Sequence, residues 1–296
     1  MAGTQLQLVS SFPWHRLFHP LCGASLPTLG GLIFRHGPPT PARLPAFCIA
    51  TATAVLRLPF TAADLALDRL AGGAPPAAPT FIIGHPRSGT THLHNLLAAT
   101  GSWATVSPVE AALPLERRTL VPLVKRFIDP YLPATRLIDG VALSPDAPTE
   151  DEVGLANLAP RSYFHAIYFP RHFGEDYAAA LLGEGPPALA AARERGLRRY
   201  VRAMARDEHR PLLLKNPAYT AQIDMLFRLF PGARVIHIHR DPLAVFDSTR
   251  RMLRRVLAEL ALQRPRADLD AVVLDTYPRV MARLRAAVPH LSLIHI

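Results

Sequence analysis

The chain has 296 residues, of which 49% are hydrophobic, so it can bury a sizeable core and a wholly disordered chain is excluded. Its formal net charge is +10, which favours an anionic partner: nucleic acid, an anionic membrane surface or an anionic small molecule. The sequence contains no zinc-finger, homeodomain or RNP pattern, so we expect no nucleic-acid partner.

Residues 1–45 are rich in proline and glycine. We expect residues 1–78 to form a helical or irregular extension, and a Gly-Gly-Ala-Pro-Pro linker at residues 72–76 places the start of the main domain near residue 79. No basic segment follows Met1 and no small-residue cleavage site closes an apolar core. A signal peptide is therefore not indicated, and we expect a cytoplasmic protein.

A long apolar stretch occupies residues 44–60 of this extension and is interrupted by Arg57 and Pro59. A helix that spans a membrane needs about 20 apolar residues, which this stretch does not supply. The simpler interpretation is a buried helix that packs on the main domain. The alternative is a helix that lies on a membrane surface between arginine flanks, which would give a peripheral membrane contact through residues 44–60.

A pattern typical of phosphate binding begins at residue 81. An apolar run ends at Gly84, a loop with the sequence His-Pro-Arg-Ser-Gly-Thr-Thr follows, and residues 92–99 are expected to form a helix. A strand, a glycine-bounded loop and a helix together present backbone N–H groups to an anion.

The loop resembles a Walker A motif with one substitution. Gly84, Gly89 and Thr91 have the right spacing, but Thr90 stands in the position of the lysine that binds the terminal phosphates of ATP. The loop therefore indicates another oxyanion, with Arg87 as the available cation.

Two further short strands each end at a basic residue. Residues 212–214 precede Lys215, residues 233–239 precede Arg240, and a helix follows each strand. This alternation predicts an α/β protein with a P-loop-like fold of three layers, in which helices flank a central parallel sheet. Ligands of such sheets bind at the carboxyl ends of the strands, so we expect Lys215 and Arg240 to lie near the loop.

With these three strand ends, the chain resembles the sulfotransferases that use 3′-phosphoadenosine 5′-phosphosulfate (PAPS), in their bacterial and tyrosylprotein-type branch. Residues 86–91 match the family's 5′-phosphosulfate loop, residues 215–217 resemble the branch's lysine motif, and Arg240 with Ser248 matches the 3′-phosphate motif. The resemblance implies that PAPS is bound by Arg87, Ser88, Gly89, Thr90, Thr91, Arg240 and Ser248.

The resemblance also implies the reaction: an acceptor hydroxyl attacks sulfur in line, and adenosine 3′,5′-bisphosphate (PAP) leaves. Lys215 is assigned to the bridging oxygen, where charge develops, and Arg87 to the sulfuryl or phosphate oxygens. Glu110 falls where the branch places a glutamate general base, and His165 is the reserve candidate. We expect no metal, because the sequence shows no carboxylate triad.

Two further stretches bear on the site. The acidic residues 146–152 are interpreted as the charged start of a helix, and they also resemble a recurring acidic stretch of the branch. The aromatic residues 163–173 are interpreted as a pocket lining. The acceptor itself is left open as the hydroxyl of a small molecule, lipid or carbohydrate, and the aromatic stretch favours an amphipathic one.

The family normally continues beyond the point where this chain stops. We therefore expect a sulfotransferase domain at residues 79–290 that is incomplete at its C-terminus, and a non-native tail at residues 291–296. Two other readings stay open: a P-loop kinase or other nucleotide phosphotransferase, which the missing lysine disfavours, and an inactive membrane-associated nucleotide-binding homologue, which residues 44–60 motivate.

Overall fold

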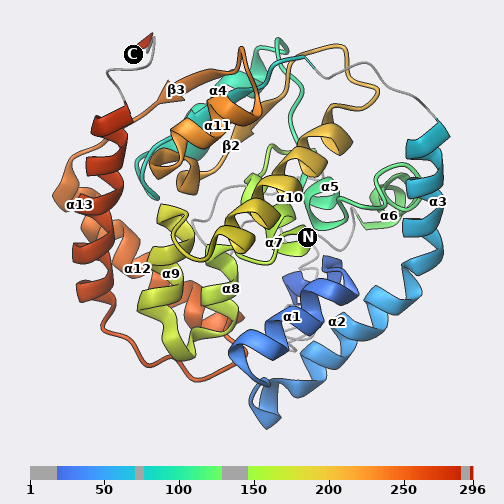
Figure 1. Cartoon of the computed structure of the whole chain (residues 1–296), viewed down its shortest axis with the longest axis horizontal. Helices are drawn as coiled ribbons and strands as arrows, with labels where there is room; N and C mark the ends of the chain where they lie inside the picture. Colours follow the sequence, from blue (N-terminus) through green and yellow to red (C-terminus); the bar gives the residue numbers. More distant parts are fainter. Residues whose placement is uncertain (1–18, 71–76, 129–145, 288–293, 296) are drawn as a thin grey trace, which may run out of the picture.

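The computed structural model describes residues 19–70, 77–128, 146–287 and 294–295 (Figure 1). The described helices are α1 (Leu26–His36), α2 (Leu44–Leu56), α3 (Leu58–Leu70), α4 (Thr90–Ala99), α5 (Pro108–Ala112), α6 (Val121–Ile128), α7 (Asp151–Leu158), α8 (Tyr163–Tyr168), α9 (Phe173–Leu182), α10 (Pro187–Ala205), α11 (Ile223–Leu229), α12 (Pro242–Leu260) and α13 (Leu269–Ala287). Short 3₁₀ turns are η2 (Pro20–Gly23), η3 (Pro41–Arg43), η5 (Pro170–His172) and η6 (Pro217–Ala221).

The described strands form one parallel sheet in the order β2-β1-β3-β4. The strands are β1 (Thr80–Ile83), β2 (Leu213–Lys215), β3 (Arg234–His237) and β4 (Ile294–His295). Ile82 pairs with Lys215 on one side and Ile236 on the other. The carboxyl ends of β1, β2 and β3 therefore lie at one edge of the sheet, as the sequence predicted.

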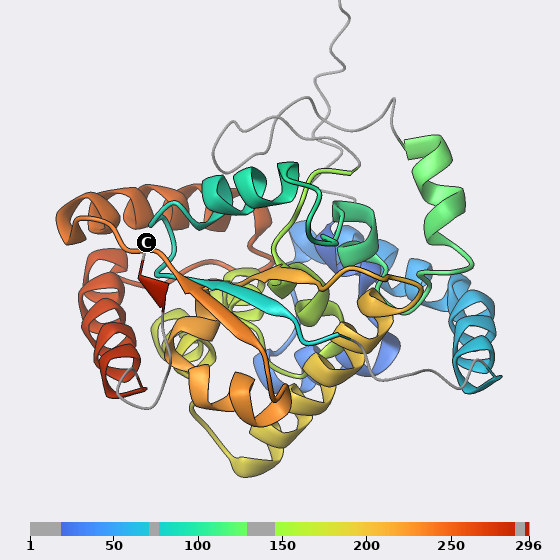
Figure 2. The ribbon, with the colours of Figure 1, turned by 90° about the horizontal axis from the view of Figure 1, so that it is seen from above.

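Helices cover both faces of this sheet, which gives the predicted three-layer α/β fold (Figure 2). One face presents Phe81, Leu214 and Val235, which are buried against apolar side chains of α10 and α11. Helix α4 packs against β1 and β2 on the other face. Consecutive apolar residues within the strands, such as Ile82 with Ile83 and Val235 with Ile236, follow from this arrangement, because a parallel sheet is covered on both sides.

The N-terminal helices share a core with helices α8, α9, α12 and α13. Leu29 and Leu32 of α1 and the buried alanines of α2 belong to the same apolar cluster as Phe169 and Leu253. The thirteen-residue α2 contributes only Ala46, Ala50 and Ala54 as buried residues. The predicted domain boundary near residue 79 follows the undescribed residues 71–76, and it stays a prediction.

The prediction of one buried helix at residues 44–60 is wrong in two respects. The stretch divides at Arg57 between α2 and α3, and the segments 41–56 and 58–70 are bent by 46° relative to each other. Several large apolar side chains of the pair are exposed rather than buried. Among the described residues no single helix is long and apolar enough to cross a membrane, although this bent pair reaches the required length and composition when counted together.

The interpretation of residues 163–173 as a pocket lining is also wrong. Tyr163, Phe164, Tyr168, Phe169 and Phe173 are all buried within the main apolar cluster. Ring stacking between neighbours, such as Phe164 with Tyr168 at 5.8 Å between centroids, fills this region. The aromatic stretch is core packing.

The predicted tail at residues 291–296 lies mostly outside the described residues. Ile294 and His295 are described, and they form the short edge strand β4 beside Ile236 and His237.

Candidate active site at the carboxyl edge of the sheet

The loop after β1, residues 84–91, is called the phosphate loop here. Its entry is fixed by Gly84, whose backbone N–H donates to Thr220 Oγ1 at 2.9 Å. Gly84 has φ +153°, and a Cβ there would lie 2.4 Å from the carbonyl oxygen of Ile238. A side chain at this position would therefore push β1 away from the end of β3.

The second half of the phosphate loop opens helix α4. Arg87 and Gly89 both have positive φ values, +72° and +102°, which curl the backbone ahead of Thr90. Gly89 is the N-cap of α4, and no side chain accepts a hydrogen bond there. The N–H groups of the first turn therefore lack a capping side chain and, with the helix dipole, favour an anion.

The loop is tied to helix α12 by two hydrogen bonds. Arg87 Nε donates to Ser248 Oγ at 2.9 Å, and Thr249 Oγ1 donates to the carbonyl oxygen of Pro86 at 3.3 Å. The predicted 5′-phosphosulfate loop and the predicted 3′-phosphate motif are thus brought together through Arg87 and Ser248.

Arg240 lies just beyond β3, and its side chain is exposed. The adjacent Asp241 caps α12, because its side chain accepts from the backbone N–H of Ala244 at 2.9 Å. Ser248 contacts Arg87 in this structure, so the expected convergence of Arg240 with Ser248 on one phosphate stays a prediction.

Lys215 ends strand β2 and is only 1% exposed. Its Nζ lies 2.5 Å from Glu150 Oε2, the residue directly before α7. A buried ammonium group needs such a partner, because an unpaired charge is costly in the protein interior. The predicted lysine is therefore held by Glu150 at the same end of the sheet as the phosphate loop.

The acidic stretch around Glu150 does more than start a helix. Glu152 is fully buried and accepts from both terminal nitrogens of Arg193 at 3.4 Å, and it also accepts from the Asn216 side chain. Asp151 is fully buried beside Lys215 and its two acidic neighbours, and burial raises the pKa of its carboxyl group well above the usual range. Sequence reasoning missed these contacts, although the opposite charges of residues 150–152 and 215 were a signal for them.

Glu110 lies in the short helix α5. Its Oε2 accepts from the backbone N–H of Ser107 at 2.9 Å and from Ser107 Oγ at 2.6 Å, while Ser107 Oγ accepts from the Glu110 N–H. This is a reciprocal capping box at the start of α5. Arg117 Nε and Lys125 Nζ lie 3.6 and 3.7 Å from its carboxylate. The role of general base stays a prediction for Glu110, which has a structural role as well.

His165, the reserve candidate for the general base, lies in the protein core. Its ring is 2% exposed, and Nε2 lies 2.7 Å from the carbonyl oxygen of Ala156 in α7. Burial lowers the pKa of this imidazole to about 3. A ring enclosed between α7 and α8 is inaccessible to an acceptor, so this placement argues against the reserve role.

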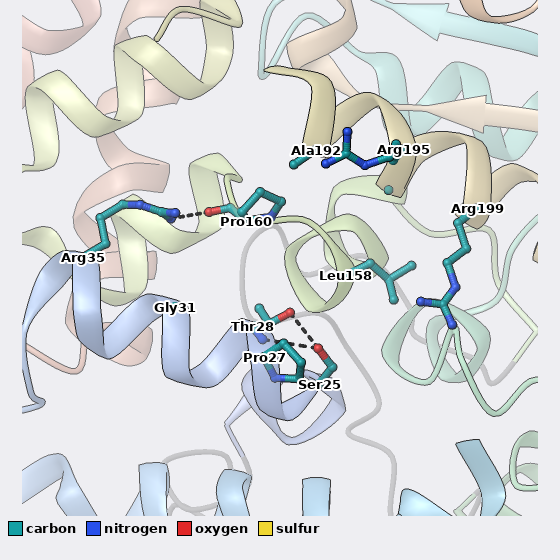
Figure 3. A pocket seen from close by; sticks show the side chains of 11 residues that line it. Ser25, Pro27, Thr28, Gly31, Arg35, Leu158, Pro160, Ala192, Arg195 and Arg199 are labelled. Atoms are coloured by element: carbon teal, nitrogen blue, oxygen red, sulfur yellow. Dashed lines mark hydrogen bonds between the residues drawn. The ribbon is translucent and has the colours of Figure 1, made fainter. Parts of the chain in front are cut away.

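A cavity of about 400 Å³ lies outside this sheet edge, between α1 and α10 (Figure 3). Arg35, Arg195 and Arg199 line it, and Arg35 donates to the carbonyl oxygen of Pro160. None of its lining residues belongs to the phosphate loop or to the ends of β2 and β3. Among the described residues, no group of three or more His, Cys, Asp or Glu side chains is arranged to hold a metal ion.

These features define a P-loop-like α/β fold whose phosphate loop has Thr90 at the position of the Walker lysine and Arg87 as its cation. The model of the sulfotransferase family matches residues 79–295, and the chain belongs to that family.

Two curated relatives carry the name omega-hydroxy-beta-dihydromenaquinone-9 sulfotransferase Stf3, one from Mycobacterium bovis and one from Mycobacterium tuberculosis. Each is 30% identical over 210 residues, which is 70% of this chain and 53% of the relative. The chain thus spans about half the length of these relatives.

Two solved structures share the fold. Sulfotransferase STF9 from Mycobacterium avium superposes with a TM-score of 0.62 at 19% identity, over 93% of this chain and 78% of that one. Sulfotransferase STF1 from M. tuberculosis H37Rv superposes with a TM-score of 0.60 at 18% identity, over 90% and 73%. Family membership leaves the kinase alternative without support.

Proposed function

We propose that this chain transfers a sulfuryl group from PAPS to the hydroxyl group of a lipid acceptor and releases PAP. The observation that carries this proposal is the phosphate loop: a helix start without a capping side chain, in which Thr90 replaces the Walker lysine and the cation is Arg87, joined to Ser248 of α12. Family membership and the name of the menaquinone-directed relatives support the same assignment.

The residues present fit the two anionic ends of PAPS, which supplies an activated sulfuryl group when bound. The backbone N–H groups of residues 88–91 are suited to the phosphosulfate, and Arg87 supplies a cation beside them. Arg240 and Ser248 would hold the 3′-phosphate through a guanidinium and a hydroxyl group. No carboxylate within the phosphate loop opposes an anion there.

Lys215 is proposed to stabilise the leaving group. In the transfer, the bond between sulfur and the bridging oxygen breaks while a bond forms between sulfur and the acceptor oxygen, and PAP keeps the electron pair. Negative charge therefore develops on the bridging oxygen, and a buried ammonium group is worth more there than in water. Glu150 orients Lys215 across the 2.5 Å contact.

Glu110 is proposed to take the proton of the acceptor hydroxyl. Its side chain is 16% exposed, so the carboxylate is not sealed within the core. The capping box and the two nearby cations fix its orientation, which general-base catalysis requires.

A lipid hydroxyl is proposed as the acceptor because both named curated relatives are sulfotransferases of a menaquinone derivative. The test is transfer of radiolabelled sulfate from PAPS to extracted lipids and, in parallel, to carbohydrate and phenolic hydroxyl acceptors. Label in the lipid fraction alone is the expected result. Label only in a water-soluble acceptor would overturn the acceptor assignment, and no transfer to any acceptor by a folded chain that binds PAP would count against the activity itself.

A further inference from the structure

Residues 44–67, which cover α2 and most of α3, have their charged side chains inside and several large apolar side chains outside, while Asp68 and Arg69 in the last turn of α3 are exposed. Residues 44–67 contain only two charged side chains, Arg57 and Asp64, and these are 7% and 5% exposed. Arg57 donates to Glu116 Oε1 at 2.8 Å and to the carbonyl oxygen of Ala24 at 2.6 Å. Asp64 Oδ2 accepts from the backbone N–H of Arg118 at 2.8 Å.

The outer surface of the pair is apolar. Among the described residues, half of the strongly exposed large apolar side chains belong to these two helices: Leu44, Val55, Leu56, Leu58, Leu67 and Leu70. The inner side of α2 is lined by three alanines, and the buried residue of α3 is an aspartate. A helix on the surface of a water-soluble domain has the opposite pattern, so this face is built for an apolar environment.

The pair lies at the edge of the molecule, opposite α13 (Figures 1 and 2). Arg57 and Asp64 anchor it to the rest of the chain through a buried ion pair and a hydrogen bond to the backbone. Because these contacts bind one side of the pair to the domain, only the other side is free to meet an apolar phase.

An arginine lies at each end of this face. Arg43 precedes α2, and Arg69 lies in the last turn of α3. Arg117, Arg118 and Arg206 line a pocket with Asp64 on the inner side of α3, where they pair with Glu110, Asp207 and Asp68 respectively. Arg43 and Arg69, one at each end of an apolar face, complement an anionic lipid surface, whereas a second copy of the chain would bring the same two positive charges and be repelled.

We propose that the outer face of α2 and α3 docks on an anionic lipid bilayer, with both helices lying in the plane of the interface. The face extends through α3 to Leu70, beyond the apolar stretch that ends at residue 60. The proposal rests on these two helices alone and is independent of the sulfuryl transfer proposed above.

The test is flotation of the purified full chain with vesicles of phosphatidylcholine and with vesicles that also contain phosphatidylglycerol. Leu56→Glu changes a side chain at the centre of the face that is 72% exposed. Leu274→Glu, on α13, changes one that is 63% exposed and adds the same charge, so it is the matched control.

The parent chain and Leu274→Glu are expected to float with the anionic vesicles and less with the neutral ones, while Leu56→Glu binds about tenfold more weakly or worse. Equal binding of the two variants would show attraction by net charge alone and would overturn the proposal. A parent chain that stays in the soluble fraction would also overturn the proposal.

A second measurement does not alter the apolar side chains. Cys48 is exposed on α2, so a polarity-sensitive dye can be attached there in a Cys22→Ser background. A blue shift of the dye on addition of anionic vesicles is expected, and an unchanged spectrum would contradict the docking.

Light scattering tests the rival occupant, since a dimer abolished by Leu56→Glu would assign the face to a second copy. Calorimetry with PAP without vesicles keeps the two proposals apart. Retained PAP binding without vesicle binding would reject only the docking surface, and vesicle binding without PAP binding would reject only the proposed function.

Discussion

Arg87 and Ser248, 161 positions apart in the chain, are joined by a hydrogen bond of 2.9 Å from the guanidinium Nε to the hydroxyl oxygen. The bond connects the loop that follows β1 to the second turn of α12. The two motifs proposed for the opposite ends of the donor are therefore held in one fixed relationship.

Replacing Arg87 tests this relationship. Arg87→Ala removes both a cation beside the proposed phosphosulfate and the bond to Ser248, so PAP affinity is expected to fall by about 10- to 100-fold. Ser248→Ala removes one hydroxyl and is expected to cost about tenfold or less. Calorimetry on both variants measures the effect. Affinities equal to that of the parent chain would remove Arg87 and Ser248 from the donor site.

Lys215 is predicted to act on the transfer step. Lys215→Met is expected to lower kcat by roughly 10²–10³-fold while PAP binding changes less, because the leaving-group charge develops only in the transition state. Glu150→Gln keeps the shape of the ion-pair partner and is expected to give a smaller loss of kcat. Turnover that survives in Lys215→Met would place the stabilising group elsewhere.

Mutation can separate the proposed role of Glu110 as general base from its structural role in the capping box. Glu110→Gln is expected to lower turnover by about 10²-fold or more if the carboxylate is the base. Ser107→Ala breaks the same capping box but keeps the carboxylate, so it is expected to cost about 1 kcal/mol of stability and little turnover. If both variants lose turnover in proportion to stability, the role of Glu110 is structural.

Three buried histidines make the fold sensitive to acid. Burial lowers the pKa of His19 and His85 to about 4 and that of His165 to about 3, against an ordinary value of 6.5. Below pH 6.5 these histidines become protonated in the unfolded chain but stay neutral in the folded chain. The free energy of unfolding therefore falls as the pH drops toward 4.

His165→Gln is expected to flatten this acid dependence by at most about 1.4 kcal/mol per pH unit, the equivalent of one proton. Urea unfolding between pH 7 and pH 5 provides the measurement. Turnover per folded molecule is expected to keep its pH profile, and a changed profile would return His165 to the list of candidate bases.

The elements that carry the site could be predicted because their signals are local. The apolar run before Gly84, the run before Lys215 and the β-branched residues before Arg240 each predicted a strand close to its observed bounds, and the helix predicted after each strand is present. Because parallel strands that are followed by helices have their carboxyl ends on the same side of the sheet, the three strand ends could be predicted to lie close together.

The ion-pair partners of the site residues could not be predicted from local sequence. The pairing of Lys215 with Glu150 joins residues 65 positions apart, and the pairing of Arg193 with Glu152 spans 41. Composition alone also led to wrong predictions. The aromatic residues 163–173, which suggested a pocket, fill the core, and the apolar residues 44–60, which suggested a buried helix, expose their leucines. Burial depends on what packs against a segment, which the segment itself does not encode.

Calorimetric titration of the folded chain with PAP and, separately, with ATP and magnesium tests whether the phosphate loop binds the sulfuryl donor. We expect micromolar binding of PAP, a loss of that binding in Arg240→Ala, and no comparable binding of ATP. Binding of ATP with magnesium in place of PAP would contradict this expectation.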